Sequence, residues 1–169
     1  MREVIRFAWG SSSLGDSMVA QSYKGVVALE FGSMRSTMED ALRARFPDAD
    51  LQLRQEELAD LMKILANVID DPATDCDLPL DLRGTPYEVN VWLMLREIPT
   101  GQTTTYGALA AKLHTRDPRD VTAAIANNGV AVIVPCHRVI RKDGSISGYR
   151  WGVKRKRILL DREKRSTKH

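Results

Sequence analysis

The chain has 169 residues and a net charge of +3, and 43% of its residues are hydrophobic and 28% are charged. These proportions exclude a disordered or fibrous protein and leave room for one domain or two small ones. Two cysteines are too few for a disulfide framework, a four-cysteine zinc site or an iron–sulfur cluster made by this chain alone. No run approaches the roughly 20 apolar residues of a membrane span, and no signal peptide is recognisable, so we expect a cytoplasmic protein without a membrane partner.

The charge is distributed unevenly along the chain. Residues 1–135 contain 13 basic and 19 acidic side chains, whereas residues 136–169 contain 12 basic and 3 acidic ones. The basic C-terminal block, which includes the run at 154–157, favours binding to a polyanion such as nucleic acid. A solvated basic tail without a partner explains the same charge equally well at this point.

The first third of the sequence predicts a small antiparallel sheet followed by helices. Three short strand-like runs are separated by turns that contain glycine: 4–9, 18–22 and 26–31. Apolar residues then recur at helical spacing over 36–46 and 55–69, and Pro47 and Pro72 follow these two stretches. We therefore expect two amphipathic helices after the sheet.

The segment 70–84 is expected to be a linker between two domains, 1–77 and 78–169. It has no helical periodicity and contains five aspartates, a composition typical of a solvated connection. A divalent-cation site made of these carboxylates is the alternative, but their spacing fits no calcium-binding loop. Cys76 lies in this segment without a histidine, cysteine or basic residue beside it, which indicates an unreactive thiol.

Helical signals return in the second half of the chain. Thr85, Pro86 and Glu88 have the spacing of a capping box, which predicts a helix that starts near residue 86. A second short helix is expected over 106–113, and Pro118 initiates a third. The last two helices match the outline of a helix-turn-helix DNA-binding unit, although helical hairpins that bind nothing are common.

The most distinctive stretch is 131–140, where an apolar run that we expect to be a strand leads through Pro135 to Cys136, His137 and Arg138. The two polar neighbours of the cysteine would need partners in a core, so the pattern favours a reactive thiol over a structural one. A nearby imidazole and positive charge are expected to stabilise the thiolate. Because adjacent residues on a strand point to opposite faces, the cysteine and histidine must communicate through a backbone turn or a bridging water.

A metal site at this position has little support in the sequence. The chain has three histidines, and no second cysteine lies near Cys136, which leaves too few ligands for a zinc site. We therefore expect neither a metal nor a cofactor.

The motif Pro-Cys-His-Arg-Val at 135–139, followed by Gly-Tyr-Arg-Trp-Gly at 148–152, resembles the O6-alkylguanine-DNA alkyltransferases, also called methylated-DNA–protein-cysteine methyltransferases. The similarity extends upstream through 78–85 and downstream to Glu163. Among family members the chain looks most like the C-terminal half of the bacterial adaptive-response protein. The resemblance implies an α/β protein with a small ribonuclease H-like sheet-and-helix domain and a mostly helical, winged-helix-like domain that carries the helix-turn-helix.

The resemblance also implies an activity. Members of the family move an alkyl group from the O6 oxygen of guanine in DNA to a protein cysteine, once per molecule. In this chain Cys136 would be the acceptor, His137 would deprotonate it through a water, and Glu163 would orient the imidazole. Asn128 matches the asparagine that braces the turn carrying the nucleophile. The implied partner of a monomeric protein is double-stranded DNA containing O6-alkylguanine, with O4-alkylthymine left open as a second substrate.

Reaching an O6 atom inside a duplex requires extrusion of the nucleotide from the base stack. The resemblance assigns Arg119 to the finger that fills the vacated stack and Tyr106 to the residue that crowds the target phosphate. These two residues are 13 apart, one fewer than the family pattern, so Arg116 is the alternative finger. Small side chains suit a helix in the narrow minor groove, and Ala123 and Ala124 are the candidates.

The base pocket implied by the resemblance uses backbone groups of Cys136, Val139 and Arg150 together with the ring of Tyr149. Lys156 matches a lysine near the site in the family pattern. Two of these residues have alternatives to a functional role: Tyr106 caps the helical hairpin, or Glu163 is one more surface charge. Trp92 and Trp151 are expected in the core.

Two other functions fit parts of the same pattern. One is a damage sensor that flips the base and transfers nothing, which the presence of the acceptor Cys136 argues against. The other is a cysteine hydrolase that uses Cys136 and His137 and turns over repeatedly. The number of alkyl groups transferred per protein, which is zero, one or many, separates the three.

Overall fold

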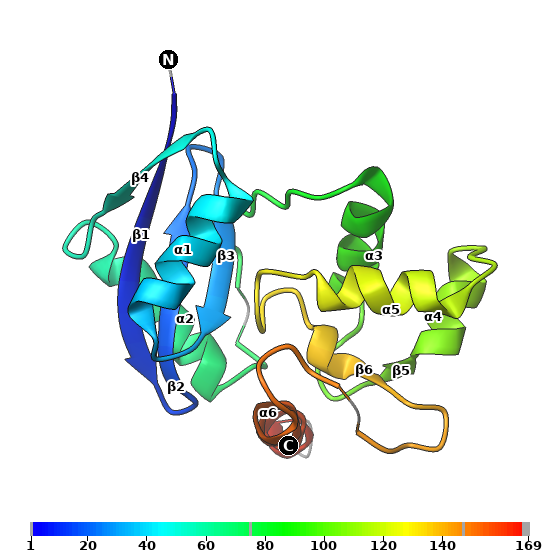
Figure 1. Ribbon diagram of the computed structural model, residues 1–169. Coiled ribbons are helices and arrows are strands. Elements are labelled where there is room, and N and C mark those ends of the chain that lie inside the picture. The colour runs from blue at the N-terminus through cyan, green and yellow to red at the C-terminus, as the bar shows by residue number, and fades with distance from the viewer. Residues whose placement is uncertain (1, 75, 147, 167–169) are drawn as a thin grey trace.

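The computed structural model describes residues 2–74, 76–146 and 148–166; Asp75, one of the linker aspartates, lies outside these ranges. The fold is mixed α/β, with a twisted sheet and its two helices on one side of the molecule and a mostly helical half on the other (Figure 1). Within the described residues no helix is both long enough and apolar enough to cross a membrane.

The sheet has four strands in the order β3-β2-β1-β4. Their bounds are β1 Glu3–Ser12, β2 Gly15–Gln21, β3 Val26–Phe31 and β4 Ala49–Leu53. The first three form the antiparallel meander that the sequence predicts. The fourth was not predicted: β4 pairs parallel to β1, with Ile5 opposite Leu51. Its alternating run is short and only half-buried, so it carries little hydrophobic signal.

Two helices follow the expected stretches and help cover opposite faces of the sheet. They are α1 (Arg35–Arg45) and α2 (Ala59–Asp70), and α2 begins later than the apolar spacing predicts because residues 55–58 form a turn. Alternate side chains of each strand point to opposite faces. One face packs with α1 into an apolar cluster that includes Ile5 and Phe7, while the other face packs against α2 and the C-terminal half.

The C-terminal half contains the three helices that the sequence predicts. α3 (Pro86–Arg96) starts with the capping box: the Glu88 amide donates to Thr85 Oγ1 at 3.1 Å, and the Thr85 amide donates to Glu88 Oε1 at 2.9 Å. α4 (Tyr106–Lys112) and α5 (Pro118–Ala126) form the helical hairpin, and α5 also packs against α3. A long C-terminal helix, α6 (Val153–Ser166), lies beneath them (Figure 1).

The apolar run before the cysteine is not a strand, which corrects the expectation from its sequence. Val130 forms a single bridge with Leu29 of β3, and residues 131–134 then turn, with Val132 at a φ of 66°. The Val134 amide donates to the Val130 carbonyl at 3.2 Å, which closes the turn. A buried turn and a buried strand both read as a short apolar run, so periodicity alone does not distinguish them.

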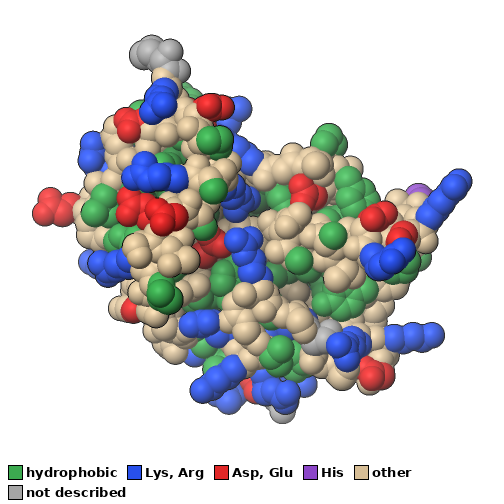
Figure 2. Space-filling view, viewed as in Figure 1, with side chains coloured by type: hydrophobic (Ala, Val, Ile, Leu, Met, Phe, Trp, Pro, Cys, Tyr) green, Lys and Arg blue, Asp and Glu red, His purple; other side chains and the backbone are tan. Residues whose placement is uncertain are grey.

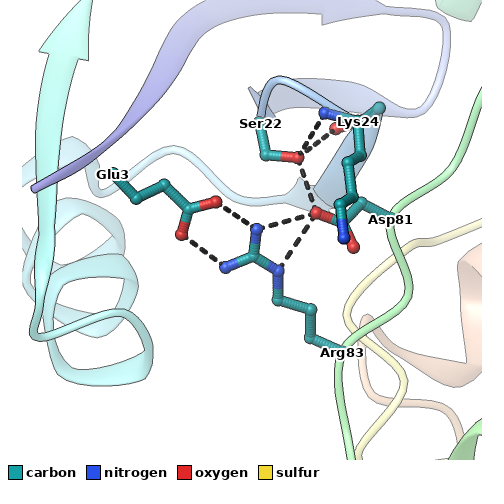
Figure 3. Close-up of polar contacts among 6 residues, drawn as sticks. Glu3, Ser22, Lys24, Asp81 and Arg83 are labelled. Atoms are coloured by element: carbon teal, nitrogen blue, oxygen red, sulfur yellow. Dashed lines mark hydrogen bonds and ion pairs between the residues drawn. The ribbon is translucent and has the colours of Figure 1, made fainter.

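The predicted linker is bound to the sheet rather than extended through solvent. The Val26 amide donates to the Pro79 carbonyl at 3.0 Å, and the Asp81 amide donates to the Val26 carbonyl at 2.8 Å. Figure 3 shows the side chains beyond this contact: Arg83 lies between the carboxylates of Glu3 and Asp81, and Ser22 donates to Asp81 at 2.6 Å. The larger apolar core is shared by both halves, so the domain boundary at residue 77 stays a prediction.

Candidate active site

Cys136 lines a small cavity. Cys136 starts a single 3₁₀ turn, η1 (Cys136–Arg138), and is 4% exposed. The cavity has a volume of about 260 Å³ and is lined by Tyr106, Thr122, Ile125, Ala126, Cys136, Gly148, Tyr149 and Arg150. Apart from Cys136, these residues come from both helices of the hairpin and from the loop before α6, so the cavity lies between the hairpin and that loop.

Asn128 ties together the turn that carries the cysteine. Its Nδ2 lies 3.3 Å from Cys136 Sγ and also donates to the carbonyls of Val130 at 3.2 Å and Val134 at 3.3 Å. Its Oδ1 accepts from the Val130 amide at 2.9 Å. One buried side chain therefore holds both ends of the turn and contacts the sulfur.

A buried charged cluster lies on the other side of the 3₁₀ turn. Glu163 of α6 accepts from His137 Nε2 at 2.6 Å with one oxygen and from Arg138 Nε with the other. Arg138 also donates to the Ile98 carbonyl at 2.5 Å and to Thr100 Oγ1 at 3.2 Å. Burial favours the neutral form of Glu163, but its contacts with His137 and Arg138 hold its pKa below the ordinary value.

The ionised carboxylate fixes the tautomer of the histidine. Because an ionised carboxylate only accepts hydrogen bonds, His137 carries its hydrogen on Nε2 and presents Nδ1 as an acceptor. Nδ1 is buried and has no hydrogen-bond partner among the described residues. Burial lowers the pKa of His137, since its ring is 0% exposed, so the imidazole is neutral at rest.

Burial also decides the state of the thiol, against the expectation of a stabilised thiolate. It raises the pKa of Cys136 to about 11, although the Asn128 hydrogen bond and the charges of Lys156 and Arg150 act in the opposite direction. Desolvation of the sulfur outweighs the positive charge around it. The resting site therefore holds a neutral thiol and a neutral imidazole beside an ionised glutamate.

The remaining residues expected near the base come from the loop before α6, from the first turn of α6 and from the residue that follows η1. The ammonium of Lys156 is buried and lies 3.4 Å from the Gly148 carbonyl, and burial lowers its pKa. Tyr149 packs edge-on against Trp151, and burial raises the pKa of its hydroxyl, which has no hydrogen-bond partner within the described ranges. Val139 does not line the cavity, and its amide donates to the Cys136 carbonyl.

Comparisons with known proteins identify the family of the chain. Residues 86–165 match the DNA-binding domain model of 6-O-methylguanine DNA methyltransferase. The chain is 36% identical to the inducible methylated-DNA–protein-cysteine methyltransferase of Bacillus subtilis over 88% of this chain and 84% of that protein. The chain belongs to the methylated-DNA–protein-cysteine methyltransferase family. The resemblance seen in its motifs is thereby confirmed.

Further relatives of the chain differ in length. It is 42% identical to the bifunctional transcriptional activator/DNA repair enzyme Ada of Escherichia coli, over 94% of this chain but only 45% of Ada. Among solved structures, Mycobacterium tuberculosis OGT in complex with DNA matches with a TM-score of 0.78 and 30% identity, over 95% of this chain and 93% of that one. The O6-methylguanine-DNA methyltransferase of the archaeon Pyrococcus kodakaraensis matches with a TM-score of 0.70 and 26% identity, over 93% and 98% of the two chains.

The candidate DNA-contacting residues of the chain differ in exposure. Tyr106 begins α4 and lines the cavity, while Arg119 is the second residue of α5, with its side chain 91% exposed and paired with Asp117. Ala123 is exposed, but Ala124 is only 3% exposed and packs against α3, where its carbonyl accepts from Trp92 Nε1 at 2.8 Å. Ala124 is therefore a core residue, which corrects its assignment to a groove-facing surface.

Hydrophobic side chains gather on the surface over α5, with Lys and Arg side chains to the right of them and below (Figure 2). Thr122, Ala123 and Ala126 are the exposed residues of this helix that follow its first turn. Arg116 is also exposed, in the turn before α5. A small, weakly polar helix surface flanked by basic residues suits a nucleic-acid groove lined by phosphates.

Sequence reasoning missed some of the residues that build the site. Arg138 was noticed only as a charge beside the cysteine, yet it holds the second oxygen of Glu163. Its position next to His137 in the motif was the available signal. Thr122, Ile125 and Ala126 line the cavity because one face of α5 points into it, and no local pattern distinguishes these residues from ordinary helix positions.

Proposed function

We propose that this chain repairs DNA by moving an alkyl group from the O6 oxygen of guanine to Cys136, once per molecule. The observation that carries the proposal is a buried thiol that lines a cavity beside α5, is held by Asn128 and comes immediately before His137, which pairs with Glu163. Family membership adds support, although the chain spans only 45% of the length of its Ada relative.

In the proposed transfer the sulfur attacks the alkyl carbon as the carbon–oxygen bond breaks. The electron pair leaves with the guanine oxygen, and the base takes up a proton from solvent. A thiol with a pKa of about 11 is almost fully protonated near neutral pH, so it needs a base. His137 Nδ1 accepts the thiol proton through a water and later releases it to solvent, while Glu163 stabilises the imidazolium. Water does not cleave the thioether product at useful rates, which makes the reaction single-turnover.

The proposed substrate is O6-alkylguanine flipped out of double-stranded DNA, with O4-alkylthymine as a second candidate. Tyr106, which lines the cavity, would contact the flipped nucleotide, and Arg119 would occupy the vacated stack after releasing Asp117. The exposed α5 residues Thr122, Ala123 and Ala126 would face the minor groove. Tyr149 and Arg150, which line the cavity, would contact the base, while contacts of Val139 and Lys156 with the base stay predictions.

The finer description of the fold belongs to the same proposal. The sheet with α1 and α2 is proposed to be a ribonuclease H-like domain, and α3 to α6 with the two-stranded pairing of β5 (Thr104–Thr105) and β6 (Val139–Ile140) a winged-helix-like domain. A monomeric state and a cytoplasmic location stay predictions.

The decisive test is the mass of the intact protein after incubation with O6-methylguanine duplex DNA. We expect a gain of one CH₂ unit per molecule, located at Cys136 by peptide mapping, and no gain in Cys136→Ser. Cys76→Ser is the matched control and should react like the wild type. No gain in the wild type would indicate a sensor, and repeated processing of lesions would indicate a hydrolase.

The finger assignment has its own test. Arg119→Ala should slow the reaction with duplex DNA at least tenfold more than the reaction with free O6-benzylguanine, because a free base needs no flipping. Arg116→Ala is the matched comparison, and we expect the smaller effect there. Equal slowing of both substrates by Arg119→Ala would assign the residue to something other than base extrusion.

A further inference from the structure

Glu30 reaches from the N-terminal sheet to the wall of the candidate active site. It lies on β3, an edge strand of the sheet, and its side chain is 14% exposed. Its Oε1 is 2.6 Å from Nη2 of Arg150, which belongs to the loop before α6 and lines the cavity with Cys136. This ion pair therefore joins the two halves of the molecule at the substrate cavity.

Arg150 has a second anchor on the turn that carries the cysteine. Its Nη1 donates to the backbone carbonyl of Asn128 at 3.0 Å, while the side-chain amide of Asn128 lies 3.3 Å from Cys136 Sγ. The guanidinium also lies over the ring of Trp151, 5.5 Å from its centroid. A continuous series of contacts thus runs from Glu30 through Arg150 and Asn128 to the sulfur.

The backbone of β3 holds the same turn directly beside Glu30. The Leu29 amide donates to the Gly129 carbonyl at 2.9 Å, and the Ala131 amide donates to the Leu29 carbonyl at 2.8 Å. The guanidinium of Arg45 covers Gly129 so closely that a Cβ there would lie 1.7 Å from Nη1. The turn after Asn128 is therefore enclosed by groups of the N-terminal half.

The charges around this turn require an anion. Burial lowers the pKa of Arg45 and the positive charge of Arg150 acts in the same direction, whereas the negative charges of Glu30 and Glu88 favour the charged form of Arg45. Without the carboxylate, Arg150 keeps the Asn128 carbonyl as its only hydrogen-bond acceptor among the described residues, and the repulsion from Arg45 is no longer balanced by Glu30. Arg150 is 36% exposed, so its side chain has solvent into which it can move.

We propose that Glu30 is a positioning residue for alkyl transfer: it holds Arg150 against the cavity wall and the Asn128 carbonyl, and thereby holds the Asn128 amide on Cys136. The proposal rests on the proposed acceptor role of Cys136. It makes the N-terminal sheet part of the site, because the only carboxylate paired with Arg150 in the described residues comes from β3. No motif of the sequence marks Glu30 for this role.

Single-turnover kinetics at saturating methylated duplex test the proposal. Glu30→Gln keeps the shape of the side chain and removes its charge. We expect its limiting rate of transfer to fall about tenfold, the scale of one lost hydrogen bond to a charged group. The affinity for DNA and the end point of one alkyl group per protein should not change. Glu39→Gln, which removes the exposed Glu39–Arg43 pair of α1, is the matched control and should keep the wild-type rate.

Two outcomes would overturn the role of Glu30. An unchanged limiting rate in Glu30→Gln would show that the pair with Arg150 does not position the site. A lower end point with an unchanged rate would show that the residue only stabilises the fold. A double-mutant cycle adds a third criterion: in an Arg150→Ala background, Glu30→Gln should slow transfer no further, and an additive effect would contradict the proposed path through Arg150.

Amide hydrogen exchange tests the same contacts without any transfer. The Val130 amide donates to Asn128 Oδ1, so loosening of Asn128 should expose it. We expect its exchange to be about tenfold faster in Glu30→Gln than in the wild type or Glu39→Gln. If the wild type accepts no alkyl group, the proposed function fails, while faster exchange would still support the hold of Glu30 on the turn. Unchanged exchange would contradict that hold.

Discussion

The two halves of the molecule bury different kinds of side chains. The face of the sheet under α1 packs a wholly apolar cluster, which includes Ile5, Phe7 and Leu42. The C-terminal half instead buries Asn128, His137, Arg138, Lys156 and Glu163, all at most 8% exposed. Buried ionisable groups cost free energy unless each is paired, whereas buried apolar groups stabilise the fold without partners. The cluster under α1 therefore serves stability alone, whereas the C-terminal half, which shares the larger apolar core, also buries the groups proposed for the chemistry.

The largest effect is expected at the centre of the buried charged cluster. Glu163→Gln removes the charge that orients His137 and leaves Arg138 buried without its counter-ion, which costs about 3–5 kcal/mol of stability. The transfer rate should fall roughly 10²–10⁴-fold because the general base loses its support. Asp161→Asn, an exposed carboxylate on the same helix, is the control. A rate within twofold of the wild type in Glu163→Gln would remove this cluster from the mechanism.

Truncation of a side chain in the apolar cluster under α1 should affect stability alone. Ile5→Ala removes a fully buried side chain of β1 and is expected to lower the free energy of unfolding by about 2–5 kcal/mol. Val4→Ala, next on the same strand but 37% exposed, should cost less. Denaturant unfolding measures both changes. If the folded Ile5→Ala protein transferred alkyl groups at an altered limiting rate, the separation of stability from chemistry would not hold.

Acid is expected to destabilise the folded protein through His137 in the C-terminal half. Burial lowers the pKa of His137 from its ordinary value of 6.5, so the unfolded chain binds a proton at a pH where the folded chain does not. The stability that the neutral, buried His137 contributes is complete above about pH 6.5, and it is lost as pH falls through the lowered pKa of the folded state. Melting temperatures should therefore decline below pH 6.5. His137→Gln should flatten this decline, whereas His114→Gln, at an exposed position, should not.

The smallest effect is expected at the surface contact between the halves. Arg83→Ala breaks the pairs with Glu3 and Asp81 shown in Figure 3. Because solvent screens these side chains, we expect a loss of about 0.2–1 kcal/mol that shrinks as salt is added. Unfolding in low and high salt measures it, with Arg43→Ala as an exposed control. A loss above about 3 kcal/mol would mean that the contact, rather than the shared apolar core, joins the halves.

The parts that sequence reasoning reached depend on neighbours along the chain. The capping box at Thr85, the helical hairpin and the antiparallel strands arise from contacts within a few residues or from turn chemistry. The parts that it missed depend on distant contacts. The pairing of β4 with β1, the turn at 131–134 and the burial of Ala124 each follow from packing against a segment far away in the sequence.

The amino-acid sequence by itself determined which chemical groups are available: one cysteine followed by a histidine and an arginine, an asparagine before them and a glutamate near the end of the chain. Only the tertiary structure decided the protonation states of these groups. Burial raises the pKa of Cys136 to about 11, and the charged partners of Glu163 keep it ionised. The tertiary structure also placed Glu30 beside Arg150. The physical reason is that desolvation and ion pairing depend on the surroundings of a group in space, which the order of residues does not specify locally.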